Sequence, residues 1–253
     1  MKKVFPVWKP AGWTPLKTIL EFKKTKLEFA HKKISYAGRL DPMAEGILLL
    51  LVGEENKKRH EYEDLRKAYE SEIVLGISTD SFDGLGIIEK IKFEKISKKE
   101  IEKYLTDFIG KQKQIYPPYS SKAVNGKSLY WWARNKKLDE IKIPEREIEI
   151  YSIDLLDYET IGVSDLVKNI IKKVKLIEGN FRQKEIINNW KKFAIENKNN
   201  ELVKIKIKVS CSTGTYIRRI AFDLGGKLGS GAFVFSIKRI SVGKYTEKDC
   251  VKL

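Results

Sequence analysis

The sequence predicts an α+β fold built around a mixed sheet. Three observations indicate it: an unbroken apolar run at residues 47–52, an alternating pattern at 202–209 that changes into a helical pattern, and two helical patterns within 160–200. Strand and helix patterns are mixed along the chain without internal repeats, as in α+β domains. With 253 residues, 42% of them apolar, the chain can bury a real core as one large domain or two small ones.

The run Ile-Leu-Leu-Leu-Leu-Val at residues 47–52 contains no polar residue and is followed by Gly53. A strand buried on both faces has this composition, so we expect it to lie centrally in the sheet.

A helix is predicted from residue 97 to residue 110. Ser97 and Glu100 form a capping box, and Gly110 ends the pattern. The apolar residues between them recur at helical spacing: Ile101, Leu105, Phe108 and Ile109.

Residues 160–200 predict a helical hairpin inserted between two strands. Ser164 can cap the first helix, Gly179-Asn180 breaks it, and Ile186 and Trp190 lie on the apolar side of the second. The segment holds nine Lys or Arg against four Asp or Glu. Two interpretations stay open: the hairpin grips RNA, or it packs its apolar face on the sheet and leaves its basic face in water. The adjacent lysines that motivate the first interpretation are Lys172, Lys173, Lys191 and Lys192.

The last two elements are a strand and a helix around Thr215. The strand is predicted to point Val203, Ile205, Ile207 and Val209 into a core and Lys204, Lys206 and Lys208 toward water or RNA. The helix that follows carries Arg218 on its first turn and is expected to stop at Gly225-Gly226.

The chain is strongly basic, with 50 Lys and Arg against 34 Asp and Glu and a net charge of +16. An excess of this kind is typical of proteins that contact nucleic acid phosphates. A lysine-rich solvated surface is the alternative, so charge alone favours a polyanionic partner only modestly.

Two cysteines and two histidines are too few for a disulfide framework or a tetrahedral zinc site, and we expect no metal. No function is assigned to these residues: His31, His60, Cys211 and Cys250. The N-terminus lacks the apolar region of a signal peptide, and the run at 47–52 is too short to cross a bilayer. A cytoplasmic protein without a membrane partner is therefore expected.

Asp41 stands in a position suited to catalysis. It lies between a turn at Gly38 and the apolar strand, and Pro42 restricts the backbone directly after it. A carboxylate held rigidly beside a core strand is a plausible catalytic group. Because Asp-Pro is also a common turn signal, this segment alone favours an ordinary turn residue.

The segment Gly38-Arg39-Leu40-Asp41-Pro42, followed by Gly46 and an apolar strand, resembles the nucleophile motif of the TruB-type tRNA pseudouridine synthases. Other segments resemble further motifs of that family in the family's order: Lys9-Pro10-Ala11-Gly12; Lys67-Ala68-Tyr69 with Leu75-Gly76 and residues 79–83; residues 117–127 with Tyr130 and Ala133-Arg134; and residues 211–218 with Asp223-Leu224-Gly225 and Lys238-Arg239. Several motifs in one order are far more specific than any single match. The resemblance covers nearly the whole chain apart from 160–200.

The resemblance implies a pseudouridine-synthase-like fold, with a mixed, mainly antiparallel sheet flanked by helices. Residues 1–253 then form one catalytic domain with 160–200 as a basic helical insertion, and no C-terminal PUA-type domain is expected because the chain ends at Leu253. The implied activity is tRNA modification: isomerisation of uridine to pseudouridine at position 55 of the T arm, after base flipping, by a monomer that needs no cofactor.

Three catalytic roles are implied by the resemblance. Asp41 acts on the flipped uridine as nucleophile, or as base in an elimination route. Arg218 pairs with this carboxylate through a two-pronged contact that a lysine cannot reproduce. Tyr69 stacks on the extruded base and replaces part of its lost stacking energy.

The same motifs imply a set of RNA-binding residues: Lys9, Tyr36, Arg39, Lys122, Lys127, Arg134, Lys238 and Arg239. For Lys9, a solvated lysine before a turn is an equally good interpretation. Tyr36 replaces a histidine found in many family members, so the RNA contact of that imidazole is altered or absent.

Two alternatives to this function stay open. One is a related synthase that acts on ribosomal or messenger RNA, and the other is a non-catalytic protein that binds and folds the same tRNA arm. The presence of Asp41, Tyr69 and Arg218 together argues against the second, since binding alone requires none of the three.

Overall fold

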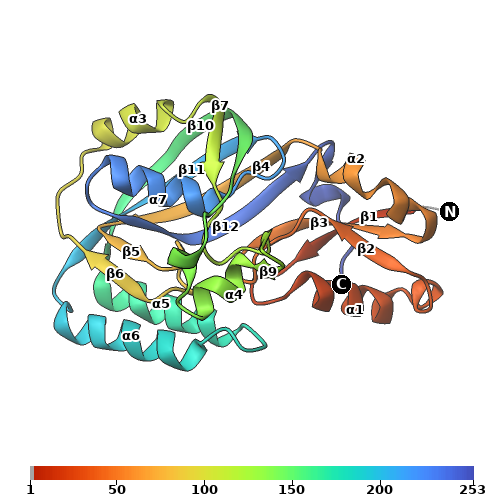
Figure 1. Cartoon of the computed structure of the whole chain (residues 1–253), viewed down its shortest axis with the longest axis horizontal. Helices are drawn as coiled ribbons and strands as arrows, with labels where there is room; N and C mark the ends of the chain where they lie inside the picture. The colour runs from red at the N-terminus through yellow and green to blue at the C-terminus, as the bar shows by residue number, and fades with distance from the viewer. Residues whose placement is uncertain (1–2) are drawn as a thin grey trace.

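The computed structural model describes residues 3–253. Within them the main sheet has nine strands in the order β1-β3-β12-β4-β11-β10-β7, with β2 paired to β3 and β13 paired to β12 (Figure 1). Its strands are β1 (Val4–Lys9), β2 (Ile34–Ala37), β3 (Glu45–Val52), β4 (Lys67–Leu75), β7 (Gly110–Ile115), β10 (Glu145–Gly162), β11 (Glu201–Cys211), β12 (Ala232–Val242) and β13 (Tyr245–Thr246). Among these strand pairs only β3 and β12 run parallel, which confirms the mixed, mainly antiparallel sheet.

Two small sheets stand outside it: β5 (Ile77–Thr79) with β6 (Ile88–Ile91), and β8 (Ala123–Val124) with β9 (Lys127–Ser128). The α-helices are α1 (Pro15–Thr25), α2 (Arg59–Glu63), α3 (Lys98–Thr106), α4 (Leu129–Arg134), α5 (Val163–Lys175), α6 (Gln183–Glu196) and α7 (Ile217–Lys227). Short 3₁₀ helices span Leu27–Phe29, Gly53–Lys58, Leu138–Glu140 and Glu247–Asp249. None of the helices in the described residues is long and apolar enough to span a bilayer.

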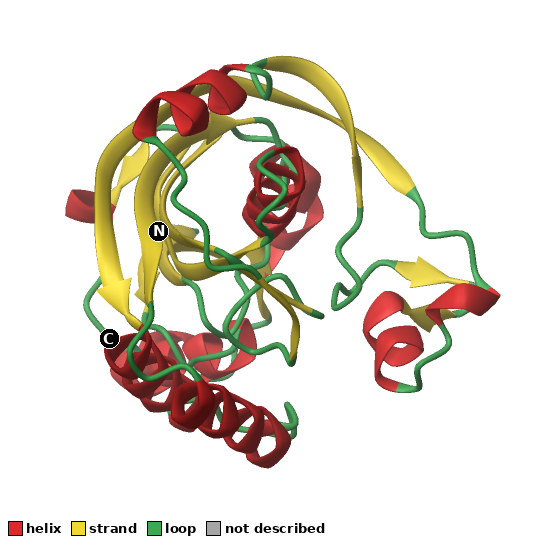
Figure 2. Cartoon of the chain, turned by 90° about the vertical axis from the view of Figure 1, so that its left-hand side faces the viewer, coloured by secondary structure: helices red, strands yellow, loops and turns green. Residues whose placement is uncertain are grey.

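Helices cover opposite faces of the sheet, which Figure 2 shows as a strongly curved layer. Successive side chains of a strand point to opposite faces. Ile73 and Leu75 of β4 accordingly pack in a core with α3 and α7, whereas Val74 packs in a second core with α5 and α6. The central strands are therefore buried on both faces.

The prediction for the apolar run is confirmed. The run forms most of β3, which pairs with β1 along most of its length, with β2 over residues 49–52 and with β12 at its start. Its leucines pack alternately, with Leu48 and Leu50 against a core that includes α1, and Leu49 and Leu51 against a core that includes Val242.

Helix ends were the weakest part of the sequence prediction. Helix α3 has the predicted capping box at Ser97 but ends at Thr106, and Gly110 instead begins β7 at φ +102°. Phe108 is buried as predicted, whereas Ile109 is 51% exposed.

Helix α7 continues through Gly225-Gly226 to Lys227. A side chain at Gly225 would come within 2.2 Å of the Ala232 nitrogen, so glycine serves here for close contact with β12 and not as a stop.

The two helices predicted at 160–200 are present as α5 and α6. The residue that precedes α5 is Gly162, so the cap predicted at Ser164 is wrong. Trp190 is fully buried and donates from its indole nitrogen to the Gly86 carbonyl at 3.2 Å. Packing of the apolar face on the sheet is thus confirmed, while an RNA contact by the exposed lysines stays a prediction.

Two lysines predicted to face water or RNA have other partners. The Lys173 amine donates to the Phe235 carbonyl at 2.9 Å, and burial lowers its pKa to about 8. Lys204 of β11 is largely buried and pairs with Glu72 and Glu159 at 3.2 and 2.7 Å. The alternation predicted for β11 is otherwise confirmed, since its four apolar residues are buried.

Candidate active site

Asp41 lies on the loop between β2 and β3, and this loop is fixed to the sheet by a buried arginine. Arg239 of β12 is 1% exposed and donates to the carbonyls of Gly38, Arg39 and Ile47 at 3.2, 3.4 and 2.7 Å. At the end of the loop, a side chain on Gly46 would come within 2.3 Å of the Arg239 carbonyl oxygen. The loop therefore joins β12 at both ends, and this holds Asp41 at one place.

The Asp41 carboxylate is paired with Arg218, 177 residues away in the chain. Arg218 lies on the first turn of α7 and its side chain is 3% exposed, whereas that of Asp41 is 30% exposed. The Arg218 Nε donates to Asp41 at 2.8 Å, and its other nitrogens donate to the carbonyls of Ser81 at 2.8 Å and Tyr119 at 3.2 Å. The predicted two-pronged contact with Asp41 is wrong, because both terminal nitrogens of Arg218 are occupied by backbone carbonyls.

A second carboxylate, Asp83, faces Arg218 from the buried side at 3.6 Å. Asp83 accepts hydrogen bonds from the Ser81 hydroxyl at 2.6 Å and the Leu85 nitrogen at 2.9 Å. Burial raises the pKa of Asp83, and the Arg218 guanidinium opposes that rise. Asp83 belongs to a segment that resembles a family motif, but the sequence indicated no role for it. The pattern Thr-Asp-Ser-Phe-Asp after a strand was the available signal.

Tyr69 and Asp41 line one cavity of about 900 Å³, together with Thr215 and Tyr216 from the loop before α7. Tyr69 belongs to β4 and lies opposite Arg239 of β12 in the sheet register. Its ring is largely buried, and burial raises the pKa of its hydroxyl to about 12. The structure thus places Asp41 and Tyr69 in the wall of one cavity, and Arg218 joins them through its ion pair with Asp41.

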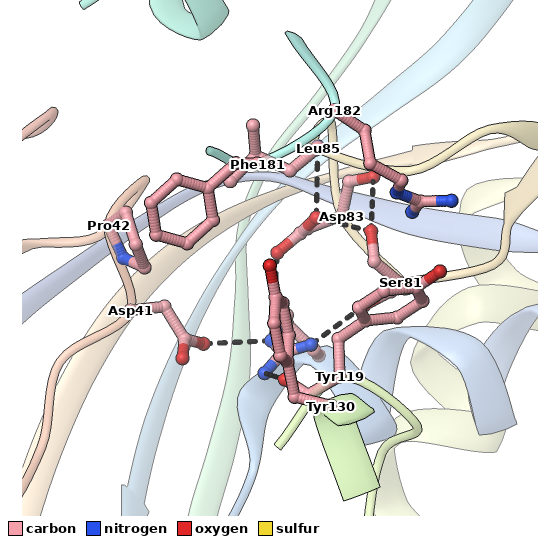
Figure 3. A pocket seen from close by; sticks show the side chains of 10 residues that line it. Asp41, Pro42, Ser81, Asp83, Leu85, Tyr119, Tyr130, Phe181 and Arg182 are labelled. Carbon is pink, nitrogen blue, oxygen red and sulfur yellow. Dashed lines mark hydrogen bonds and ion pairs between the residues drawn. The ribbon is translucent and has the colours of Figure 1, made fainter. Parts of the chain in front are cut away.

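A smaller pocket of about 70 Å³ is also lined by Asp41, together with Arg218 (Figure 3). Phe181 and Arg182 line it from the connection between α5 and α6, opposite Tyr119 and Tyr130. The position of the hairpin between two strands, the second leading to Arg218, placed it near the catalytic cleft, but no motif indicated Phe181 or Arg182.

The connection at 176–182 is attached to three parts of the chain. Arg182 donates to both Asp80 carboxylate oxygens at 2.8 and 3.2 Å. Asn180 accepts from Arg134 of α4 through its carbonyl at 2.8 Å and its side chain at 2.9 Å. The third attachment is an ion pair between Glu178 and Lys17 of α1.

Comparison with known proteins agrees with this geometry. Residues 24–176 match the description "TruB family pseudouridylate synthase (N terminal domain)". The chain belongs to the TruB family. The tRNA pseudouridine synthase B of Oceanobacillus iheyensis is 31% identical over 253 residues, covering 99% of this chain and 69% of the relative. That of Listeria innocua is 32% identical over 254 residues, covering 100% and 70%.

Solved structures show the same fold as this TruB-family chain. A Cbf5-Nop10-Gar1 complex matches with a TM-score of 0.62 and 19% identity over 99% of this chain and 52% of the solved chain. An H/ACA RNP bound to a substrate RNA containing 2'-deoxyuridine matches with a TM-score of 0.58 and 16% identity over 99% and 50%. This chain therefore spans about half the length of those solved chains.

Two of the RNA-binding residues expected for a TruB-family member are internal. Lys9 is 0% exposed, and its amine donates to the carbonyls of Pro10 and Trp13 at 3.0 and 2.8 Å. Burial lowers the pKa of Lys9 to about 7. Arg239 donates to two carbonyls of the Asp41 loop and one of β3. The RNA contact predicted for Lys9 is wrong, because the side chain is fully buried and its amine has two carbonyl acceptors. Arg239 lines the large cavity, so its RNA contact stays a prediction.

The other predicted RNA-binding residues lie in different places. Tyr36 and Arg39 line the large cavity, where the Arg39 guanidinium lies 3.3 Å from the Tyr36 hydroxyl. Lys122 and Lys127 are exposed on the segment of β8 and β9.

The remaining two are paired within the protein. Arg134 is bound to Asn180 as described. Lys238 pairs with Glu247 at 3.4 Å and lies outside both pockets. The cavity thus contains Tyr36 and Arg39 but not Lys238.

Proposed function

We propose that this TruB-family chain isomerises uridine to pseudouridine at position 55 in the T arm of tRNA, with Asp41 as the catalytic carboxylate. The observation that carries the proposal is the pairing of a partly exposed Asp41 with a buried Arg218 at a cavity whose wall contains Tyr69. The names of the relatives, tRNA pseudouridine synthase B, support tRNA as the substrate. A cytoplasmic monomer, with residues 1–253 forming one catalytic domain, is part of the same proposal.

The reaction needs no co-reactant. The C1′–N1 bond breaks and a C1′–C5 bond forms, while the proton lost from C5 is balanced by the proton gained at N1. Because these atoms are inaccessible in a stacked arm, the uridine must be flipped into the cavity. Asp41 then attacks as nucleophile or removes a sugar proton in an elimination route. Both routes use the Asp41 carboxylate, which the Arg218 Nε holds in place by donating to it at 2.8 Å.

The test of this proposal is a map of pseudouridines in total RNA from cells with and without the protein. Loss of pseudouridine at position 55 of tRNA, restored by the wild-type chain, is expected. Loss at sites in ribosomal or messenger RNA with an unchanged T arm would assign the chain another RNA. An unchanged map together with intact T-arm binding would instead indicate a non-catalytic folding protein.

Tyr69→Phe and Tyr69→Leu are expected to differ. Phe keeps the ring that stacks on the flipped base, so tRNA affinity should stay within about twofold, while turnover falls because the hydroxyl beside Arg239 is lost. Leu removes the ring and should weaken binding by ~1–3 kcal/mol as well as slow turnover. Affinity by filter binding and single-turnover rates separate the two effects. Equal behaviour of the two variants would contradict the stacking role.

A further inference from the structure

Arg146 of β10 lines the large cavity and has no hydrogen-bond or ion-pair partner among residues 3–253. Its Nε is buried without a partner. A buried donor left unsatisfied costs free energy and is rare in folded proteins. An arginine of this kind in a cavity wall therefore favours an acceptor from a bound ligand.

Two other basic side chains of the cavity wall, Lys67 and Arg239, already have backbone acceptors. The Lys67 amine donates to the carbonyls of Glu63 and Leu65 at 2.7 and 2.6 Å. Arg239 donates to three carbonyls of the Asp41 loop and β3. Arg146 differs from both because its guanidinium keeps its donors free while it lines the cavity.

The position of Arg146 is fixed by the loop at 212–216. Its guanidinium lies directly against Gly214, where a side chain would come within 1.8 Å of the Arg146 Nη1. The loop is held on both sides: Ser212 exchanges two hydrogen bonds with the Glu149 backbone, both at 2.8 Å, and Gln114 binds the Tyr216 backbone at 2.8 and 3.2 Å. The guanidinium is thus held against a loop that is itself fixed.

The same loop leads into α7, whose first turn carries Arg218. Helix α7 has no side-chain cap at its N-terminus, and Tyr216 and Ile217 at this end line the cavity with Arg146. A helix N-terminus favours negative charge, so it adds to the attraction that the free guanidinium exerts on an anion.

We propose that Arg146 binds a backbone phosphate of the RNA strand next to the flipped uridine. The inference rests on the proposed function, since it assigns the polyanion in the cavity to the substrate. A planar guanidinium with free N–H groups suits a phosphate, which accepts two parallel hydrogen bonds. The contact does not depend on base identity. It holds the RNA strand in the cavity that Asp41 also lines.

Arg146→Ala should weaken binding of a T-arm stem-loop RNA about tenfold, because one charge-assisted phosphate contact is lost. The slope of log affinity against log salt should flatten by about 0.7–0.9, and KM should rise with little change in kcat. Arg146→Lys should keep the slope and recover only part of the affinity, since an ammonium cannot make the planar contact.

Lys113→Ala is the matched control. Lys113 lies on β7 beside Arg146 of β10 but points to the opposite face, where it pairs with Glu145 at 2.8 Å outside the cavity. Its removal takes one charge from the same pair of strands and should leave RNA affinity within about twofold of wild type. An affinity and salt slope of Arg146→Ala equal to those of Lys113→Ala would overturn the inference.

Two further measurements keep the outcomes distinct. Thermal melting checks that the variants fold, and Arg146→Gln, which keeps most of the side-chain length without the charge, replaces the alanine variant if that one is unstable. Pseudouridine yield of the wild-type chain is measured on the same RNA. If none forms, the proposed function fails. If pseudouridine forms and Arg146→Ala and Arg146→Gln bind normally, only the role of Arg146 fails.

Discussion

Asp41→Asn is expected to lower pseudouridine formation by a factor on the order of 10³ or more while tRNA affinity stays within about twofold. The change is nearly isosteric, and the amide oxygen can still accept from the Arg218 Nε, 2.8 Å away in the wild type. The charge and the nucleophile are lost, and neither reaction route operates without them. Arg218 remains partly neutralised by Asp83 on its buried side, so the fold should tolerate the substitution.

Turnover is measured by release of a labelled hydrogen from C5 of the target uridine, and affinity by filter binding. Equal melting temperatures of variant and wild type establish that the difference is chemical. Turnover within tenfold of the wild type would contradict the assignment of Asp41.

Arg218→Lys should reduce turnover by a factor on the order of 10² and also lower stability. Three nitrogens of Arg218 donate in three directions, to Asp41, Ser81 and Tyr119. One ammonium on a flexible chain cannot reach all three acceptors in the same geometry, so at least one buried carbonyl loses its partner at a cost of ~1–3 kcal/mol. Asp41 then loses the guanidinium that fixes its orientation.

Arg219→Lys is the matched control for this variant. Arg219 is the next residue of α7, but it forms its ion pair with Asp223 of the same helix and does not line either pocket. Its activity and melting temperature should stay close to wild type. If Arg218→Lys behaved like Arg219→Lys in single-turnover rate, the positioning role of Arg218 would be wrong.

Local patterns predicted the strands better than the ends of the helices. The run in β3 and the alternation in β11 were readable because burial follows directly from apolar composition. Helix α7 continues through its two glycines because Gly225 packs against Ala232 of β12. Local helix signals do not include a contact with the following strand. The end of α3 was misplaced for a similar reason, since Phe108 is buried by tertiary packing outside the helix.

The site was predictable only as far as the motifs reached. Asp41, Tyr69 and Arg218 were found together by resemblance, although their separation in the chain hides the ion pair of Asp41 with Arg218 and the cavity that Asp41 shares with Tyr69. The sequence could not tell a buried cation from an exposed one, because Lys9 and Arg239 donate to backbone carbonyls that no side-chain pattern records. Arg146 was missed for the converse reason: an arginine near the start of a strand such as β10 has no sequence feature that separates it from a solvated one.

The attachment of the α5–α6 connection to α1, α4 and Asp80 has a consequence for the thermodynamics of RNA binding. Helix α4 belongs to a segment with only a two-stranded sheet of its own, which alone would be weakly ordered. The contacts of Asn180 with Arg134 order it in the free protein. The entropy of fixing this segment is thus lost when the chain folds and not when RNA arrives, so association should proceed by docking onto a preorganised surface.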